Sequence, residues 1–425
     1  MFRFSQHDTA IDKMSSKTTK WLCCQLGARE HYAIPRALFR RSVLEQLVTD
    51  GWAAPSSFLR KFSGHRFAKR FHQELRDAPV TSFNSSLITF ELLARARRPG
   101  DWRKIIARNQ WFQQRICSFL RSQPSTFKSQ PILLSYSYTA LEPFRHAKSQ
   151  GWKTVLVQID PGPEEERIVA EEVARVPEFA GHWQAAPAEY WVRWRQECEL
   201  ADRIVVNSEW SREGLVRRGV PTEKLSVIPL AYEPLDVGGQ NSEAGSLRLY
   251  PDRFTKERPL RVLFVGQVNL RKGVARLLEA ARMLQDQPVE FWIVGPVRIT
   301  NSKVIARDMR LKWFGPATWK QVAEKYRAAD VFILPTLSDG FAITQLEAQA
   351  HSLPIIASKF CGKVVESGRN GIILEEPTDT SIAAAIRDCI ADPNRLQNLA
   401  AASYVANEFM IDALAQHLQK LGATL

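Results

Sequence analysis

Short apolar runs alternate with stretches of helical periodicity along most of the chain. The runs occupy residues 21–26, 132–137, 154–159, 203–207, 226–230, 261–266, 289–295, 311–315, 330–335, 354–358 and 371–374. Runs of this length, separated by helical segments, are typical of buried strands in parallel βαβ units. The first run ends at Gly27 and precedes a helix predicted over 28–41, which is how a doubly wound domain begins.

The alternation stops at 234–258, a stretch rich in Gly, Ser, Pro and charge, and resumes afterwards. We therefore predict a linker at 236–258 between two domains. The predicted parts are a flexible tail, an N-terminal Rossmann-like domain, the linker, a C-terminal Rossmann-like domain and a final helix that packs back on the first domain: 1–19, 20–235, 236–258, 259–405 and 406–425. The predicted fold class is α/β, with two doubly wound parallel sheets that face each other across a cleft. Ligands of such sheets bind at the carboxyl ends of the strands.

Composition agrees with a globular, intracellular protein. Of the 425 residues, 45% are hydrophobic and 24% charged, which suits two or three packed domains. The six cysteines form no C-x-x-C pair, which disfavours a zinc ribbon and is typical of a reducing compartment. The polar N-terminus lacks the apolar core of a signal peptide, and no apolar run is long enough to cross a membrane. We expect a cytoplasmic protein, free or at the inner face of a membrane.

The formal net charge of +13 is concentrated in one segment. Between Arg29 and Lys128 there are 19 Lys and Arg residues but only 7 Asp and Glu residues. This segment either forms solvated helix faces or faces an anionic lipid or acceptor. Nucleic acid is the weaker alternative because no zinc finger or RRM core is present.

The richest segment for chemistry runs from Pro335 to Ala350, where a strand, a short loop and a helix follow each other. Asp339 and Gly340 lie in the loop, and the helix is predicted to begin near Phe341, Ala342 and Ile343. Its free backbone amides would bind an anion such as a diphosphate, and Gly340 would let the backbone approach closely. Asp339 and Glu347 are eight residues apart and can face the same cleft, where carboxylates accept hydrogen bonds from sugar or ribose hydroxyls. Alternatively, Asp339 only caps the helix and Glu347 forms a salt bridge.

A second strand–loop–helix segment runs from Val265 to Gly273 and carries Gly266, Arg271 and Lys272. The helix dipole disfavours cations at the start of a helix. The position of Arg271 and Lys272 is reasonable if an anion lies between their side chains. A solvated basic turn is the alternative. The segment matches neither G-x-G-x-x-G nor the P-loop, which argues against NAD and ATP.

Two further candidates lie at the ends of N-terminal strands. Gly27 would approach a bound sugar or only close a turn. Asp160 would bind a sugar hydroxyl or assist proton transfer, although Asp-Pro-Gly is also a common turn. The chain contains no D-x-D, so we predict that the diphosphate is stabilised without a metal. G-x-S-x-G is also absent, and no nucleophile–base pair is recognised.

These segments resemble family 4 of the glycosyltransferases, the retaining group 1 enzymes with the two-domain GT-B fold. GQVNLRKG is similar to the phosphate loop of the family, LPTLSDGFAITQLEAQAHSLPIIAS to its Glu-x7-Glu signature, and CGKVVESGRNGIIL to the stretch that follows. Weaker similarities, LGAREHYAIPRALFRR and ADRIVVNSEWSREGLVRRGV, extend to about residue 21.

The resemblance implies roles for these residues. Lys272, with Arg271, would bind the diphosphate together with the amides of 341–343. Glu347 would bind the ribose, Asp339 the transferred sugar, and Gly315 would border the base. The chain departs from the family pattern at Asp339, which replaces a glutamate, at Gln267, which replaces an arginine, and at Asp160, which stands where a histidine is often found.

The predicted function is therefore transfer of a hexose-type sugar from a nucleotide-diphosphate donor to a hydroxyl acceptor, with retention and without a cofactor. The acceptor would be a lipid-linked compound, a polysaccharide or another glycan, and segment 29–128 would contact an anionic membrane. The alternatives are a nucleotide-sugar epimerase and a non-catalytic basic protein that binds membrane or nucleic acid. The base, the sugar, the acceptor and the oligomeric state are not determined by the sequence.

Overall fold

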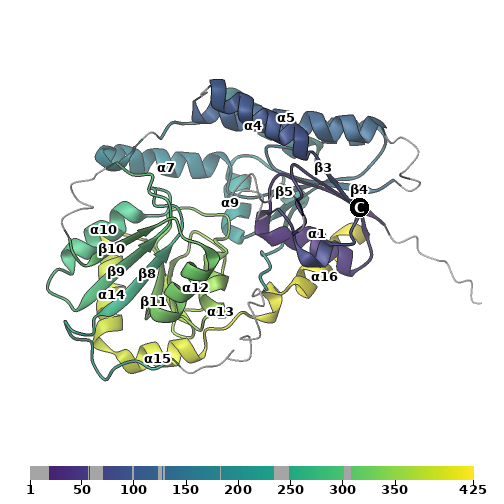
Figure 1. Ribbon diagram of the computed structural model, residues 1–425. Helices are drawn as coiled ribbons and strands as arrows, with labels where there is room; N and C mark the ends of the chain where they lie inside the picture. Colours follow the sequence, from purple (N-terminus) through teal and green to yellow (C-terminus); the bar gives the residue numbers. More distant parts are fainter. Residues whose placement is uncertain are drawn as a thin grey trace, which may run out of the picture.

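The computed structural model describes residues 19–55, 57, 70–97, 100–122, 127, 130–181, 183–233, 248–300 and 308–425. These residues form two parallel sheets, one of seven strands and one of six, in two separate domains (Figure 1). Helices cover the faces of both sheets, which confirms the predicted class of two Rossmann-like doubly wound domains.

The N-terminal sheet has the strand order β3-β2-β1-β4-β5-β6-β7. Its strands are β1 (Trp21–Gln25), β2 (Leu44–Thr49), β3 (Val80–Ser82), β4 (Ile132–Tyr136), β5 (Thr154–Gln158), β6 (Arg203–Val206) and β7 (Leu225–Val227). β1 pairs with β2 on one side and β4 on the other, so the strand order reverses beside β1. In open α/β sheets this reversal opens a crevice at the carboxyl ends of the strands.

Both faces of this sheet are buried. Trp21 and Cys23 of β1 belong to one core cluster, and Leu22 and Cys24 belong to the cluster on the opposite face. The helices of the domain are η1 (Arg29–Tyr32), α1 (Ala33–Arg40), η2 (Gln73–Leu75), α4 (Asn84–Arg97), α5 (Asp101–Ser122), α6 (Leu141–Ser149), α7 (Pro163–Arg175), η3 (Pro177–Phe179), α8 (Ala188–Leu200), α9 (Glu209–Arg217) and η4 (Thr222–Lys224). Burial on both faces explains the continuous apolar character of the central strands.

The C-terminal sheet has the order β10-β9-β8-β11-β12-β13. Its strands are β8 (Leu260–Val265), β9 (Val289–Val294), β10 (Leu311–Gly315), β11 (Val331–Leu334), β12 (Ile355–Ser358) and β13 (Gly371–Leu374). The helices that follow are α10 (Val274–Met283), α12 (Trp319–Ala328), α13 (Thr344–Ala350), α14 (Asp379–Ala391), α15 (Pro393–Ala401), η6 (Asn407–Phe409) and α16 (Ile411–Ala423).

Every apolar run of the sequence coincides with a strand, but β2 and β3 were missed. β2 includes Glu45 and Gln46, which are half-buried and interrupt the apolar pattern. β3 has only three residues, all of intermediate burial. A strand with polar residues in its first half, such as β2, and a three-residue edge strand, such as β3, therefore lack the apolar signal that marks the central strands.

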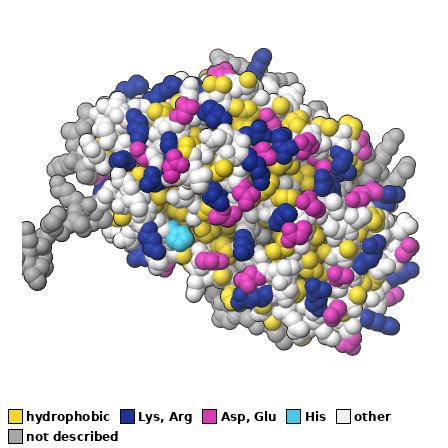
Figure 2. All heavy atoms as spheres, turned by 180° about the vertical axis from the view of Figure 1, so that it is seen from behind, with side chains coloured by type: hydrophobic (Ala, Val, Ile, Leu, Met, Phe, Trp, Pro, Cys, Tyr) yellow, Lys and Arg dark blue, Asp and Glu magenta, His cyan; other side chains and the backbone are white. Residues whose placement is uncertain are grey.

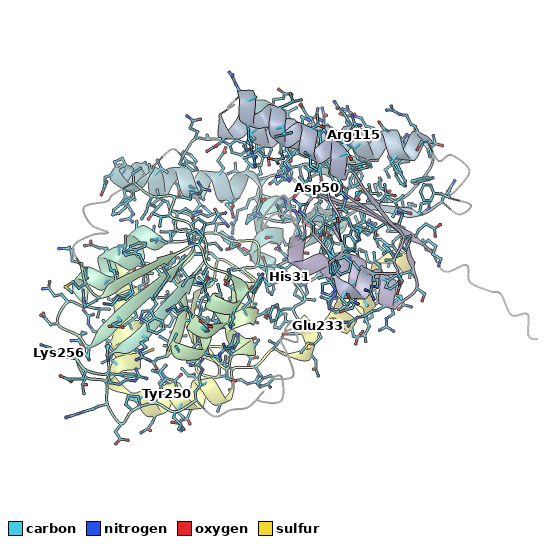
Figure 3. The ribbon with its side chains drawn as sticks, viewed as in Figure 1. His31, Asp50, Arg115, Glu233, Tyr250 and Lys256 are labelled. Carbon is cyan, nitrogen blue, oxygen red and sulfur yellow. The ribbon has the colours of Figure 1, made fainter. Side chains whose placement is uncertain are left out.

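The prediction of one helix over 28–41 is wrong at its beginning. Glu30, His31 and Tyr32 have left-handed backbone angles, with φ of 50°, 51° and 60°. The regular helix α1 begins only at Ala33. The residues before it form a compact turn, which places His31 on the side of the domain that faces the C-terminal domain (Figure 3).

Part of the predicted linker, 236–247, lies outside the described residues. Residues 248–258 pack on the C-terminal domain: Phe254 is buried in its core, and the Tyr250 hydroxyl donates to the Asp330 carbonyl at 2.8 Å. The Arg248 guanidinium donates to the carbonyls of Tyr326, Ala329 and His351. This stretch therefore belongs structurally to the second domain.

The last helix, α16, returns to the N-terminal domain. It packs against α1, and Leu414, Leu418 and Leu421 are buried in the core cluster that contains Trp21. The described cysteines are all free and buried. Among the described helices, none combines the length and the apolar character needed to cross a bilayer.

Candidate functional site at the domain interface

Two loops of the C-terminal domain meet at the carboxyl ends of neighbouring strands. β8 leads into Arg271 and Lys272, and β11 leads into Asp339, whose carboxylate forms an ion pair with the Lys272 ammonium. The backbone amide of Leu337 donates to the Arg271 carbonyl at 2.9 Å. A Cβ added to Gly273, which has φ of +70°, would lie 1.9 Å from the Pro335 carbonyl oxygen, so only glycine allows this approach.

The N-terminal domain adds Glu165, in the first turn of α7, to this cluster. Its Oε2 lies 3.4 Å from Nη1 of Arg271 and accepts a hydrogen bond of 3.2 Å from the Ser338 hydroxyl. Arg271 Nη1 also lies 3.4 Å from Oδ1 of Asp339. The Arg271 guanidinium therefore bridges carboxylates of both domains.

Asp160 lies beside the same contact. Its Oδ1 accepts hydrogen bonds from the Tyr138 hydroxyl at 2.6 Å, from the Gln158 side chain at 2.9 Å and from the Gly162 amide at 2.9 Å. The bond from Gly162 is the one expected of an Asp-Pro-Gly turn. The other two show that the carboxylate also organises the carboxyl end of β5.

The two domains touch at Gly340. A Cβ at Gly340 would lie 2.1 Å from the Ile159 carbonyl oxygen, and the Ser208 hydroxyl donates to the Gly340 carbonyl at 2.5 Å. The backbone of one domain thus contacts the backbone of the other next to Asp160 and Asp339.

The cluster contains three carboxylates and two cations. Burial raises the pKa of Glu165 to about 7; Asp160 and Asp339 add to this rise, while Arg271 and Lys272 oppose it. Burial also opposes the ionisation of Asp339, but Lys272 and Arg271 outweigh it and hold its pKa below the usual range. The pKa of Arg271 is raised because the carboxylates outweigh the effect of burial, so this residue remains a cation.

Glu347 lies in α13 and is buried. Its Oε2 accepts a hydrogen bond of 3.0 Å from the hydroxyl of Tyr326, a fully buried residue of α12. The neighbouring Thr344 hydroxyl is buried and has no hydrogen-bond partner among the described residues. Asp339 lies in the loop after β11, whereas Glu347 lies in the first turn of α13.

The helix predicted near Phe341 begins later, at Thr344, so that prediction is corrected. Phe341 is buried against Phe409, and Ala342 has a left-handed φ of 64°. Residues 341–343 form an irregular turn whose backbone amides donate no hydrogen bond to another described residue. The feature that carries these amides is therefore a turn instead of a helix.

The predicted glycines all lie at carboxyl ends of strands. Gly27 follows β1, and its amide donates to the Asp50 carboxylate at 3.0 Å. Gly266 follows β8 with φ of 154°, and Gly315 ends β10 with φ of 63°.

His31 contacts Trp319 across the domain interface, with ring centroids 4.9 Å apart. The turn after β1 and the start of α12 therefore meet on the side of Gly315.

Sequence reasoning missed Glu165. It belongs to the run Pro163-Glu-Glu-Glu at the start of α7, and acidic residues in a first helical turn usually only complement the helix dipole. The available signal was its position, five residues after Asp160 and just beyond a predicted strand.

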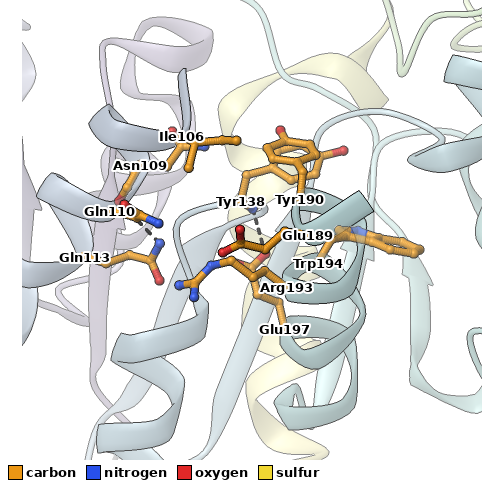
Figure 4. A pocket seen from close by; sticks show the side chains of 10 residues that line it. All are labelled: Ile106, Asn109, Gln110, Gln113, Tyr138, Glu189, Tyr190, Arg193, Trp194 and Glu197. Atoms are coloured by element: carbon orange, nitrogen blue, oxygen red, sulfur yellow. Dashed lines mark hydrogen bonds between the residues drawn. The ribbon is translucent and has the colours of Figure 1, made fainter. Parts of the chain in front are cut away.

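A pocket lined mostly by polar side chains lies between α5 and α8 (Figure 4). Tyr138 and Tyr190 stack there with ring centroids 4.8 Å apart. The Glu197 carboxylate accepts a hydrogen bond of 2.7 Å from the Tyr138 amide. These contacts hold Tyr138, whose hydroxyl donates a hydrogen bond to Asp160.

Comparison with known proteins agrees with this arrangement. Residues 259–392 match the family model for glycosyl transferases group 1. The D-inositol 3-phosphate glycosyltransferase of Geodermatophilus obscurus is 30% identical over 210 residues, which cover 45% of this chain and 46% of that protein. The enzyme of the same name from Corynebacterium kroppenstedtii is 26% identical over 245 residues, covering 53% of this chain and 54% of that protein. The chain thus spans about half the length of the curated relatives it matches.

Solved structures show the same fold over nearly the whole chain. A crystal structure of Anabaena HepE in complex with UDP and glucose has a TM-score of 0.60 at 14% identity and covers 96% of this chain and 100% of that one. Sucrose-phosphate synthase from Thermosynechococcus elongatus has a TM-score of 0.63 at 16% identity, covering 96% of this chain and 98% of that one. These comparisons confirm the resemblance to glycosyltransferases and the GT-B architecture.

Proposed function

We propose that this protein is a glycosyltransferase that moves a hexose-type sugar from a nucleotide-diphosphate donor to a hydroxyl acceptor. The observation that carries the proposal is the meeting of Arg271 and Lys272 with Asp339 at the domain interface. The match of residues 259–392 to group 1 glycosyltransferases supports it, as does the fold shared with a HepE structure that contains UDP and glucose.

In this proposal the donor diphosphate binds to Lys272, Arg271 and the amides of 341–343. Negative charge develops on the diphosphate as the anomeric carbon becomes oxocarbenium-like, and prearranged cations and amides stabilise that charge. The described site keeps Lys272 and Arg271 ion-paired with carboxylates, so their side chains are ordered before the donor arrives. We assign the charge stabilisation to these groups of the chain and not to a metal.

The remaining groups position the sugar and the acceptor. Asp339 contacts the transferred hexose and Glu347 the ribose, while Gly266, Gly315 and Gly27 let the backbone approach the donor. The acceptor hydroxyl approaches from the N-terminal domain, on the side of Asp160. Transfer proceeds with retention, and either the leaving phosphate or Asp160 receives the acceptor proton.

We further propose that the basic N-terminal segment brings the protein to an anionic membrane that carries a lipid-linked or polysaccharide acceptor. Leu92 and Leu93 of α4 and Ile105 of α5 are exposed, and Arg103 and Lys104 belong to the same pair of helices. Other arginines of the segment, including Arg36, Arg70 and Arg108, are paired with carboxylates, which reduces the free charge. Figure 2 shows acidic and basic side chains interspersed on one face of the molecule.

A ligand screen combined with one substitution tests the donor site. We expect at least one of UDP-glucose, GDP-mannose and ADP-glucose to raise the melting temperature, since a ligand of the native state stabilises it by mass action. Lys272→Ala is expected to weaken that binding and to lower kcat/KM at least tenfold, or about 1.4 kcal/mol. Lys312→Ala, at an exposed position of β10, is the matched control and should change neither. Equal affinity in wild type and Lys272→Ala would reject the assignment.

A further inference from the structure

Glu165 of the N-terminal domain contacts the proposed diphosphate site directly. Its carboxylate lies 3.4 Å from the Arg271 guanidinium and 3.2 Å from the Ser338 hydroxyl, both in the C-terminal domain. The indole of Trp210, from α9, donates to the same Ser338 hydroxyl at 3.1 Å. One carboxylate thus joins α7 to both loops that form the site.

The charges around Glu165 come from three loops. Arg271 and Lys272 face it from the loop before α10, Asp339 from the loop after β11, and Asp160 from the loop after β5. Its neighbours on α7 are engaged elsewhere. Glu164 pairs with Arg167 and Arg218, and Glu166 accepts hydrogen bonds from the Ala186 amide and the Trp191 indole.

With all five groups ionised, the cluster carries one net negative charge before any donor binds. A nucleotide-sugar diphosphate adds two more negative charges and requires the cations that Glu165 and Asp339 now neutralise. Asp339 keeps Lys272 as a partner, whereas the Glu165 carboxylate loses its ionic partner if Arg271 turns to the phosphates. A buried carboxylate without a cation is costly, and protonation relieves the cost.

We propose that Glu165 is a positioning residue for the donor: it orders the Arg271 guanidinium in the empty site and takes up a proton when the diphosphate binds that guanidinium. This inference rests on the proposed function. The protonated carboxyl group would keep its contact with Ser338 while Arg271 turns to the phosphates. Donor binding would therefore be coupled to the ionisation state of a residue in the opposite domain.

The direction in which donor affinity changes with pH follows from the ionisation of Glu165 in the site without donor. Because burial raises the pKa of Glu165 to about 7, the carboxyl group is largely protonated at lower pH and ionised at higher pH. Above the pKa of Glu165 in the site without donor, binding of a nucleotide sugar requires that Glu165 take up one proton. The affinity for the nucleotide sugar should therefore fall about tenfold between pH 6 and pH 8. The diphosphate diester of the ligand does not titrate in this range, unlike the terminal phosphate of a free nucleotide.

Calorimetric titration of the full chain tests this proposal directly. UDP-glucose, GDP-mannose and ADP-glucose are titrated in two buffers of different ionisation enthalpy, which gives the number of protons exchanged on binding. For the sugar nucleotide that binds, we expect uptake of about one proton at pH 8 and nearly none at pH 6. Glu165→Gln, which imitates the protonated carboxyl group, should abolish the uptake and bind equally at both pH values.

Glu172→Gln is the matched control. Glu172 lies two turns further along α7 and forms a similar interdomain ion pair, with Arg276 at 2.8 Å, outside the site. This variant should keep the proton uptake and the pH dependence of the wild type. Binding without proton uptake, or uptake that persists in Glu165→Gln, would overturn the inference while leaving the proposed function intact. Failure of all three sugar nucleotides to bind would overturn both.

Discussion

At the scale of single residues, the site depends on a few hydrogen bonds that hold acidic side chains in place. Asp160 accepts three hydrogen bonds, and Glu347 accepts one from the Tyr326 hydroxyl. Tyr326 is 1% exposed, so its hydroxyl has a fixed position beside Glu347. In the proposed donor complex, a carboxylate held in this way would meet a ribose hydroxyl without reorganising.

Removal of the Tyr326 hydroxyl tests this support. Tyr326→Phe keeps the ring in its packed position but deletes one hydrogen bond to Glu347, worth about 1 kcal/mol. We expect the donor dissociation constant to rise about fivefold, as measured by titration calorimetry, with kcat less affected. Tyr250→Phe is the control because it deletes a similar hydroxyl, bonded to the Asp330 carbonyl, away from the site. Equal effects of the two substitutions would argue against a specific role for Tyr326.

At the scale of secondary-structure elements, α16 links the end of the chain to its beginning. The helix packs on α1, and its apolar side buries Leu414, Leu418 and Leu421 in the N-terminal core. The Tyr232 amide also donates to the Phe409 carbonyl at 2.8 Å, just before this helix. The N-terminal domain is therefore completed by a helix that follows the second domain in sequence.

Truncation of one buried side chain measures this contribution. Leu418 is fully buried, so Leu418→Ala should lower the free energy of unfolding by about 2–5 kcal/mol through lost burial and a residual cavity. Urea denaturation followed by circular dichroism gives this value. Gln416→Ala, on the exposed side of the same helix, should change the stability by less than about 0.5 kcal/mol. A similar small effect at Leu418 would mean that α16 packs only loosely on α1.

At the scale of the whole molecule, the relative position of the two domains is defined by close backbone contact and by ion pairs. Gly340 meets the Ile159 carbonyl, and Arg276 of α10 binds Glu172 of α7. Gly181 and Thr300 also form a hydrogen bond between the domains, at 3.2 Å. The cluster of Asp160, Glu165, Arg271, Lys272 and Asp339 exists only while these surfaces touch.

A methyl group at Gly340 should separate the domains without unfolding either. In Gly340→Ala the new carbon would meet the Ile159 oxygen at 2.1 Å and the Asn207 amide nitrogen at 2.8 Å, both in the other domain. We expect a larger radius of gyration in small-angle X-ray scattering and at least a tenfold loss of kcat/KM, with each domain still folded. Gly100→Ala, where the added carbon has no neighbour within 4 Å, is the control. An unchanged radius would show that the interface tolerates the methyl group.

The sequence alone determined the two-domain α/β fold and one half of the site. Central strands that are buried on both faces must be apolar throughout. In the sequence they therefore form short, continuous apolar runs separated by helical segments, a pattern that indicates a parallel α/β sheet. Lys272 and Asp339 lie in the loops that follow two such strands, and parallel strands bring their carboxyl ends to one edge. Their meeting therefore followed from local pattern and sheet topology.

Only the tertiary structure decided what the second domain contributes. The contact of Glu165 with Arg271 joins residues more than a hundred positions apart and depends on how two separate cores pack together. The turn at 30–32, the late start of α13 and the return of α16 are likewise set by distant contacts. Local periodicity carries no information about these contacts, because their energy comes from surfaces that meet only after both domains have formed.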